Sequence, residues 1–260
     1  MMRALWSAAS GMRAQQTNLD TVSNNLANVN TTGYKKFRAE FQDLHYQTLK
    51  VAGTPGAVGY SAPVGEQVGM GTQVVATQRF FSQGDFQNTS NPYDLTIQGN
   101  GFFRIQMPDN TVAYTRDGSF KIDSNGQMVT ADGNQLDPSI VVAPDATNVT
   151  ISADGTVTQT VNGQQQQVGQ ITLANFINPA GMESVGKNLY RATLASGQEV
   201  VGNPGQQGIG TIAQGMLERS NVDVAEEMVN MIVAMRAYES NSKAIQTSDE
   251  MLQIANNARR

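Results

Sequence analysis

Cysteine is absent from this 260-residue sequence, and histidine and tryptophan occur once each. Without thiols there can be no disulfide scaffold, no thiolate catalysis and no cysteine-ligated metal site. The single histidine, His45, cannot form a histidine cluster. The aspartates that precede glycines lack the alternating acidic ligands of a calcium loop. We therefore expect no cofactor, no metal site and no catalytic residues.

Charged residues are also scarce, at 15% of the chain, and the net charge is −5. Binding to nucleic acid requires a basic patch, so this balance argues against nucleic acid as a partner. No apolar run approaches the roughly 18 residues that a membrane-spanning helix needs. Polar residues, among them Ser7, Ser10 and Arg13, interrupt the signal-like start of the chain. We predict no membrane span and no cleaved signal peptide.

What the chain does contain is a row of apolar residues spaced by seven at each end, a pattern that keeps one helix face toward a partner. The pattern predicts one helix over about 3–28 and another from an N-cap at Asp223 to about 256. The expected assembly seams are Leu5, Met12, Leu19, Val22, Leu26, Val29, Val224, Met228, Met231, Met235, Tyr238, Ile245 and Leu252. Because burial of these seam residues offsets only part of the backbone entropy lost in ordering both helices, we expect full order only against neighbouring subunits.

The region between the helices has the composition of strands and turns. Residues 95–97, 102–105 and 112–115 are short strand candidates, and residues 164–167 are a predicted low-complexity loop. Asp-Gly or Asn-Gly pairs, which suit tight hairpins, occur at 117–118, 125–126, 132–133, 154–155 and 162–163. The predicted fold class is α+β, with paired, coiled-coil-like N- and C-terminal helices flanking a mainly antiparallel β middle domain.

Four ordered motifs resemble the signatures of bacterial flagellar rod and hook proteins. They are NNLANVNTTGYK at 24–35, YTRDGSF at 114–120, SNVDVAEEMV at 220–229 and RAYESNSKAI at 236–245. The first carries the residues we assign to the family signature, namely Asn24, Asn25, Leu26, Ala27, Asn28, Thr32, Gly33 and Tyr34. From the residues alone, the three asparagines at 24, 25 and 28 read as helix-surface or inter-subunit hydrogen-bonding groups. Gly33 reads as the left-handed C-cap of the first helix.

The resemblance implies a structural subunit rather than an enzyme. Members of this family polymerise helically into a hollow, stiff shaft that crosses the periplasm, carries torque and passes exported subunits through its channel. The implied partners are further copies, proximal-rod and hook proteins, the surrounding P and L rings, and the flagellar type III export apparatus. The implied division is an inner helical domain at 1–32 and 222–260, a connecting segment at 33–70 and an outer β domain at 71–221.

Within the family, the length and the segment 46–63 resemble distal-rod members more than hook members. We expect this segment to stiffen the rod by lying along a neighbour, through Tyr46, Leu49, Pro55, Tyr60 and Pro63. A proximal-rod or hook role is the nearest alternative. A secreted β-domain adhesin and a glycan hydrolase are the alternatives of a different class. A hydrolase needs two carboxylates flanking a cleft, and the aspartates here mostly lie in predicted turns.

Overall fold

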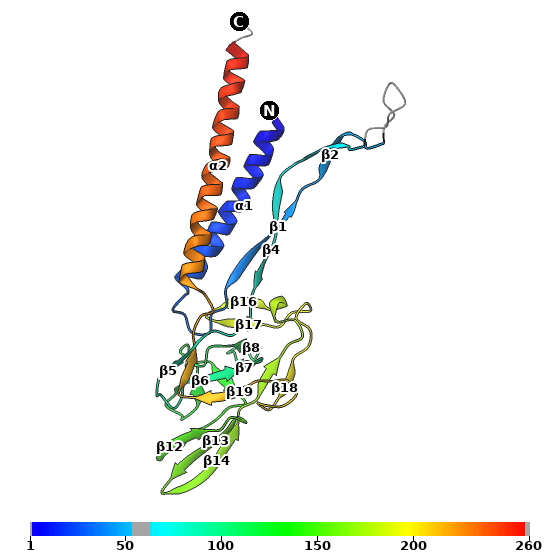
Figure 1. The fold of residues 1–260 in the computed structure, drawn as a ribbon. Helices are drawn as coiled ribbons and strands as arrows, with labels where there is room; N and C mark the ends of the chain where they lie inside the picture. The colour runs from blue at the N-terminus through cyan, green and yellow to red at the C-terminus, as the bar shows by residue number, and fades with distance from the viewer. Residues whose placement is uncertain (1, 54–62, 258–260) are drawn as a thin grey trace. The chain divides into compact units, whose positions relative to one another are not determined.

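The structure is a computed structural model, and it describes residues 2–53 and 63–257. The chain divides into two compact units (Figure 1). The first unit consists of the described residues of Met1–Ala27, Phe37–Gln78 and Asp223–Arg260, and the second consists of Asn28–Lys36 and Arg79–Val222. The division into inner, connecting and outer domains stays a prediction about function.

The first unit contains both long helices, α1 at Met2–Ala27 and α2 at Val224–Asn257. The two helices contact each other and run in opposite chain directions, as Figure 1 shows. Asp223 is the predicted N-cap, because its Oδ1 accepts hydrogen bonds from the amides of Ala225 at 2.8 Å and Glu226 at 3.3 Å. Within residues 2–53 and 63–257, neither helix combines the length and the apolar character that would span a bilayer.

The first unit also contains two strand pairs. Strand β1 (Phe37–Asp43) pairs with β4 (Thr72–Arg79), and β1 contacts α1. Strand β2 (Tyr46–Lys50) runs antiparallel to β3 (Glu66–Gly69), a pairing that the sequence did not reveal. Of the five residues predicted to stiffen a rod, Tyr46, Leu49 and Pro63 are exposed. Pro55 and Tyr60 lie outside the described residues.

The second unit is built from short strands and one 3-10 helix, η1 (Pro179–Gly181). Its strands are β5 (Phe86–Asn88), β6 (Leu95–Gln98), β7 (Phe102–Gln106), β8 (Val112–Thr115), β9 (Lys121–Ile122), β10 (Met128–Val129), β11 (Gln135–Asp137), β12 (Ala146–Ile151), β13 (Thr156–Val161), β14 (Gln164–Gln170), β15 (Leu173–Asn175), β16 (Glu183–Gly186), β17 (Leu189–Arg191), β18 (Val200–Gly202), β19 (Thr211–Gln214) and β20 (Met216–Glu218). All three predicted strands are present, as β6, β7 and β8. The pairings are antiparallel, so the predicted α+β class is confirmed.

A nine-stranded sheet organises this unit, in the order β16-β17-β8-β7-β11-β10-β9, with β15 paired to β7 and β18 paired to β15. Strands β12, β13 and β14 form a separate three-stranded sheet, and β6–β19 and β5–β20 are two-stranded pairs. Side chains alternate between the two faces of a strand. On β7, Phe103 and Ile105 therefore join the main core, whereas Phe102 joins an aromatic cluster with Tyr114 and Phe176. Both faces of the central strands are thus buried, which rigidifies the unit.

The predicted turns are mostly correct. Gly126, Gly133, Gly155 and Gly163 have positive φ, and each lies between two paired antiparallel strands. The hairpin predicted at Asp117–Gly118 is wrong. Residue 118 instead passes against the backbone of β6, where its amide oxygen accepts a hydrogen bond from the Leu95 amide at 3.0 Å.

The loop predicted at 164–167 is also wrong, because these glutamines belong to strand β14. Their backbone groups pair with β13, from Thr156 opposite Gln170 to Val161 opposite Gln164. Backbone hydrogen bonds hold an edge strand together without apolar side chains. Composition alone therefore could not separate this strand from a polar loop.

We expect Gly118→Ala to destabilise the second unit. A Cβ at position 118 would lie 1.6 Å from the carbonyl oxygen of Leu95, so backbone must move, at a cost of about 1–3 kcal/mol or more. Gly169→Ala is the matched control, because its Cβ would meet only Ile140 Cγ1, at 3.7 Å. Thermal unfolding of both variants should show a large drop in Tm for the first and almost none for the second. Equal Tm values would contradict the packing described here.

Candidate assembly surface

The most buried residues on the face of α2 that packs against α1 are polar or small. Asn25 Nδ2 donates to Glu227 Oε2 at 3.3 Å near one end of the helix pair. Further along, a Cβ on Gly11 would lie 2.9 Å from Asn241 Nδ2, so glycine permits the close approach of the helices there. The α2 residues on this face recur at intervals of seven: Glu227, Ala234, Asn241 and Ser248. Three of these four are buried, which identifies this row as the contact within one chain.

The predicted seam residues do not make up this row. On α1, Val22 is buried and the others are half-buried: Leu5, Met12, Leu19 and Leu26. Val29, which follows the helix, is also half-buried. On α2, Met231 and Ile245 are half-buried. The remaining predicted residues of α2 are 37–52% exposed: Val224, Met228, Met235, Tyr238 and Leu252. Their role in assembly stays a prediction.

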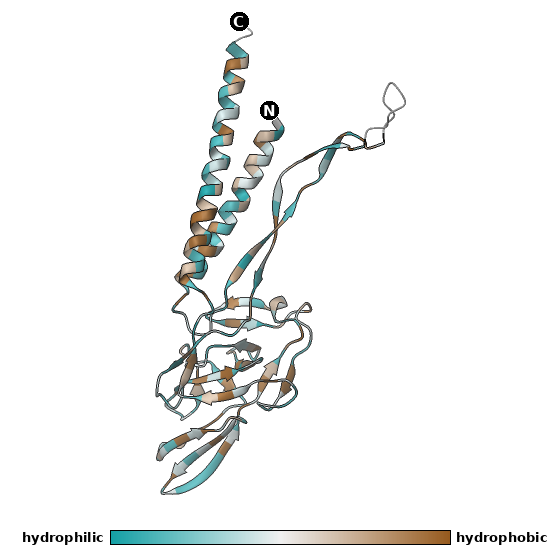
Figure 2. Cartoon of the chain, in the orientation of Figure 1, coloured by the Kyte–Doolittle hydropathy of each residue, from teal (hydrophilic) through white to brown (hydrophobic). Residues whose placement is uncertain are grey.

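Further large apolar side chains of α2 are more exposed still. Val229, Ile232, Val233 and Ile254 are exposed by 59, 57, 62 and 68%. Figure 2 shows these apolar segments as brown bands along α2. Contiguous exposed apolar surface marks an interaction site on a folded protein. Helix α2 therefore contacts α1 through a face of polar and small residues with Met231 and Ile245 half-buried beside them, and its other large apolar side chains remain exposed.

Sequence reasoning missed the row that packs within the chain because it followed large apolar residues only. The available signal was the seven-residue spacing of Ala234, Asn241 and Ser248, together with Gly11 on the other helix. Small residues let two helix backbones approach, and large ones keep them apart. A search for small residues at heptad spacing would have separated the two faces of α2.

Asn25 is the signature residue whose expected position was wrong. It is 1% exposed rather than on the helix surface, and its amide bonds within the chain. Its Nδ2 donates to the carbonyl of Phe37 at 2.8 Å, and its Oδ1 accepts from the amide of Phe37 at 2.9 Å. The side chain thereby imitates a strand partner at the start of β1 and also reaches Glu227 on α2. One amide thus connects three elements of the first unit.

A buried ion cluster in the second unit brings three sequence motifs together. Lys35 is the last residue of the first motif, Arg116 lies in the second motif, and Glu218 lies just before the third. All three side chains are buried, with exposed fractions of 0, 3 and 1% for Lys35, Arg116 and Glu218. Lys35 Nζ donates to Glu218 Oε1 and, at 2.8 Å, to the carbonyl of Ser82. Arg116 NH1 donates to Glu218 Oε2 at 3.4 Å. The carboxylate therefore bridges two cations that are far apart in the sequence.

The surrounding backbone satisfies further polar atoms of the cluster, although the buried Nε of Arg116 has no hydrogen-bond partner among the described residues. The amide of Gly84 donates to Glu218 Oε1 at 3.0 Å, and Arg116 NH2 donates to the carbonyl of Gly99 at 2.6 Å. Burial lowers the pKa of the Lys35 ammonium, and the Glu218 carboxylate opposes that shift. Burial likewise lowers the pKa of the Arg116 guanidinium, again opposed by Glu218. The carboxylate is thus what makes two buried positive charges tolerable.

Gly33 lies where the first motif crosses the second, and not at the end of a helix. It has the predicted left-handed conformation, with φ at +68°, but α1 already ends at Ala27. Its amide donates to the carbonyl of Glu218 at 2.8 Å, and a Cβ would lie 2.7 Å from the amide nitrogen of Asp117. The predicted C-cap role is therefore wrong. Glycine is required because the first motif passes directly over the second.

The sequence held one signal for this cluster that was not used. Lys35 is the only charged residue of the first motif, and Arg116 is the only cation of the second, in a chain with few charges. A charge in such a setting is usually paired when it is buried. The partner could not be read from the sequence, since Glu218 lies 183 residues from Lys35.

We expect Glu218→Gln to destabilise the protein by about 3–5 kcal/mol, because it leaves two buried cations without a counter-charge. Glu183→Gln is the matched control, since it removes the same charge from an exposed pair with Arg191. Exposed ion pairs contribute little, so the control should unfold near the Tm of the unmodified protein. Denaturant titration of both variants measures the difference. Similar stabilities would show that the cluster does not depend on its carboxylate.

Comparison with known proteins shows which protein families carry these motifs. Residues 5–35 match the family described as "Flagella basal body rod protein". Residues 96–159 match "Flagellar hook protein FlgE/F/G D1 domain", and residues 213–258 match "Flagellar basal body rod FlgEFG protein C-terminal". The three matches follow the order of the motifs that suggested the family.

Relatives that align over nearly the whole chain narrow the family assignment further. The chain is 56% identical to "Flagellar basal-body rod protein FlgG" of Borreliella burgdorferi over 264 aligned positions, which cover 100% of both chains. It is 49% identical to the protein of the same name from Buchnera aphidicola subsp. Schizaphis graminum, covering 97% of this chain and 98% of the relative. It is 47% identical to the protein of the same name from Caulobacter vibrioides, covering 99% of this chain and 100% of the relative. The chain therefore belongs to the FlgG family of flagellar basal-body rod proteins, whose members are structural rather than enzymatic.

Proposed function

We propose that this protein polymerises helically with copies of itself into the distal rod, a hollow and stiff shaft. The shaft transmits torque from the motor to the hook and lets exported subunits pass through its channel. Its neighbours would be proximal-rod and hook proteins, the surrounding P and L rings and, before assembly, the flagellar type III export apparatus. The proposal rests on one observation above all, which is the uncovered apolar surface of α2.

The chemistry of the helix pair supports polymerisation. The most buried α2 residues are polar or small, and Met231 and Ile245 are only half-buried, so much of the apolar surface of α2 stays exposed. Met228, Val233 and Met235 are instead at least half exposed. Full burial of such a side chain stabilises a complex by about 1.5–3 kcal/mol. Neighbouring subunits would supply that burial, and the helices would gain stability as the polymer grows.

The β2–β3 pair supports a role in stiffness. Tyr46 and Leu49 lie on β2 and are each 47% exposed. An antiparallel pair with exposed aromatic and aliphatic side chains can lie along another subunit and oppose shear between the two. A shaft that carries torque needs such broad contacts in addition to those of its helices.

Charge on the apolar surface of α2 should block polymerisation. We expect Met235→Lys to raise the critical concentration for polymerisation about thirtyfold, since it forfeits roughly 2 kcal/mol of burial. Asn230→Lys is the matched control, because it places the same charge at an exposed polar position of the same helix. Sedimentation and electron microscopy measure the polymer, and circular dichroism verifies that both monomers fold. If both variants polymerise alike, the apolar surface of α2 is not an assembly surface.

Removal of residues 46–63 should leave assembly possible but soften the polymer. The deletion takes away β2 and with it a contact that resists shear. Bending stiffness can be measured from the curvature of polymers in electron micrographs. The double variant Tyr46→Ser, Leu49→Ser is a second and milder test. Its backbone hydrogen bonds preserve the strand pair, while the exposed Tyr46 and Leu49 side chains are lost. Unchanged persistence length in both variants would refute the stiffening role.

A further inference from the structure

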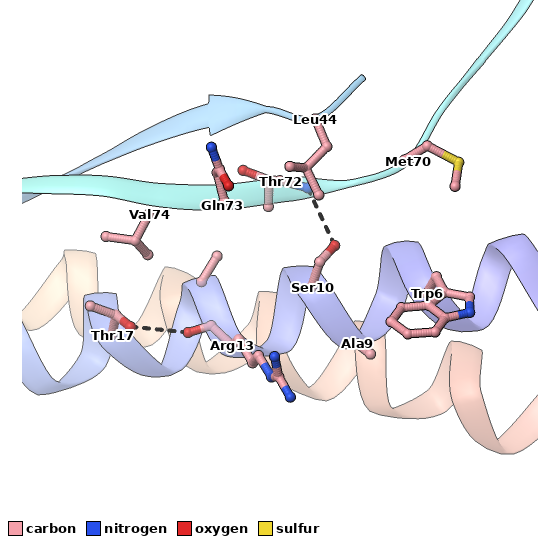
Figure 3. A pocket seen from close by; sticks show the side chains of 11 residues that line it. Trp6, Ala9, Ser10, Arg13, Thr17, Leu44, Met70, Thr72, Gln73 and Val74 are labelled. Atoms are coloured by element: carbon pink, nitrogen blue, oxygen red, sulfur yellow. Dashed lines mark hydrogen bonds between the residues drawn. The ribbon is translucent and has the colours of Figure 1, made fainter. Parts of the chain in front are cut away.

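A groove of about 460 Å³ lies in the first unit, between α1 on one side and strand β4 with Leu44 and Met70 on the other. Figure 3 shows its floor, a stripe of α1 residues spaced by three and four: Trp6, Ser10, Arg13 and Thr17. The amide of Thr72 donates to Ser10 Oγ at 3.3 Å, which ties the strand side to the helix. This stripe excludes Gly11 and Asn25, so it faces away from the contact with α2.

The groove has the character of a docking site for an apolar, acidic helix. Trp6 is 70% exposed, and Val74 stands on the opposite wall. Exposed aromatic residues beside apolar walls are typical anchors of interfaces. Among the described residues that line the groove, Arg13 provides the only charge. An occupant should therefore present apolar side chains with a carboxylate beside them.

The same chain carries a segment of that kind at the end of α2. Ser248 is the last buried residue of the helix, and residues 249–257 are exposed throughout. Met251 and Ile254 lie three apart on one side of the helix, and Glu250 lies four before Ile254, at the edge of that side. No basic residue occurs from 244 to 257, and Arg259 and Arg260 come only after this segment. The charge of this segment is thus complementary to that of the groove.

The dimensions also agree. At 1.5 Å per residue, the stripe from residue 6 to residue 17 is about 16 Å long and the segment 249–257 is about 12 Å long. Met251 is 50% and Ile254 68% exposed in the same structure that contains the groove. A chain therefore does not fill its own groove with its own α2, which leaves both the groove and the helix end available to a second copy.

We propose that residues 249–257 of one copy dock in the groove of a second copy. Met251 and Ile254 pack against Trp6 and Val74, and Glu250 pairs with Arg13. The contact is heterologous, because a groove meets a helix end, so it can repeat without closing. This inference rests on the proposed function, since it specifies one contact of the polymer.

The absence of cysteine allows a direct test by disulfide trapping. Val74→Cys and Ile254→Cys chains are mixed in equal amounts, allowed to polymerise and then oxidised. We expect a disulfide-linked dimer as the main product in the sedimented polymer. The control mixture pairs Val74→Cys with Asn230→Cys, an exposed position of α2 outside the docking segment, and should give at least tenfold less dimer.

A charge exchange tests the same contact without cysteine. Arg13→Glu should raise the critical concentration about fivefold, as should Glu250→Arg, because each places like charges together. A chain that carries both substitutions should regain most of the original value, which a purely local effect on folding would not produce.

The outcomes separate the two proposals. Polymers that form without the Val74–Ile254 disulfide, or without recovery in the doubly substituted chain, would overturn the docking contact and leave the proposed function intact. If the unmodified protein forms no polymer at any concentration, the proposed function fails and the docking contact fails with it.

Discussion

The second unit depends on a single carboxylate. Glu218 holds Lys35 and Arg116 in an environment where each cation would otherwise be costly, and the backbone of Gly84 completes its hydrogen bonds. Since a buried charge is tolerated only with its partners in place, the segments that carry these residues must come together or not fold. Strand β20, which carries Glu218, is thereby joined to the segment 28–36, where the chain first enters the second unit. The Gly33 amide strengthens the same connection through the carbonyl of Glu218.

The first unit has the opposite arrangement, with polar residues at its helix contact and apolar side chains exposed on α2. Its helices meet through Asn25, Glu227 and the close approach at Gly11, and these contacts specify how the helices align without burying much apolar surface. Most large apolar side chains of α2 remain exposed, and Met231 and Ile245 are half-buried. Such a division is consistent with the proposal that the helices reach full stability only in the presence of other subunits.

Much of the fold could be predicted from local signals. The strands β6, β7 and β8, the N-cap at Asp223 and four of the five glycine turns depend on residues close together in sequence, and local sterics decide them. The errors arose where a distant partner decides the outcome. Gly118 lies against the backbone of β6, β14 is a strand because β13 pairs with it, and Asn25 is buried because β1 and α2 cover it.

The sequence by itself determined the family, the presence of two long terminal helices and the β character of the region between them. These follow from ordered motifs, from a spacing of seven and from turn residues, all of which act over a few residues. Only the tertiary structure decided which face of α2 meets α1 and which carboxylate neutralises Lys35. A helix can carry two rows with the same spacing, and the spacing does not say which row packs. Likewise, an ion pair across 183 residues depends on how the chain returns, which no local pattern records.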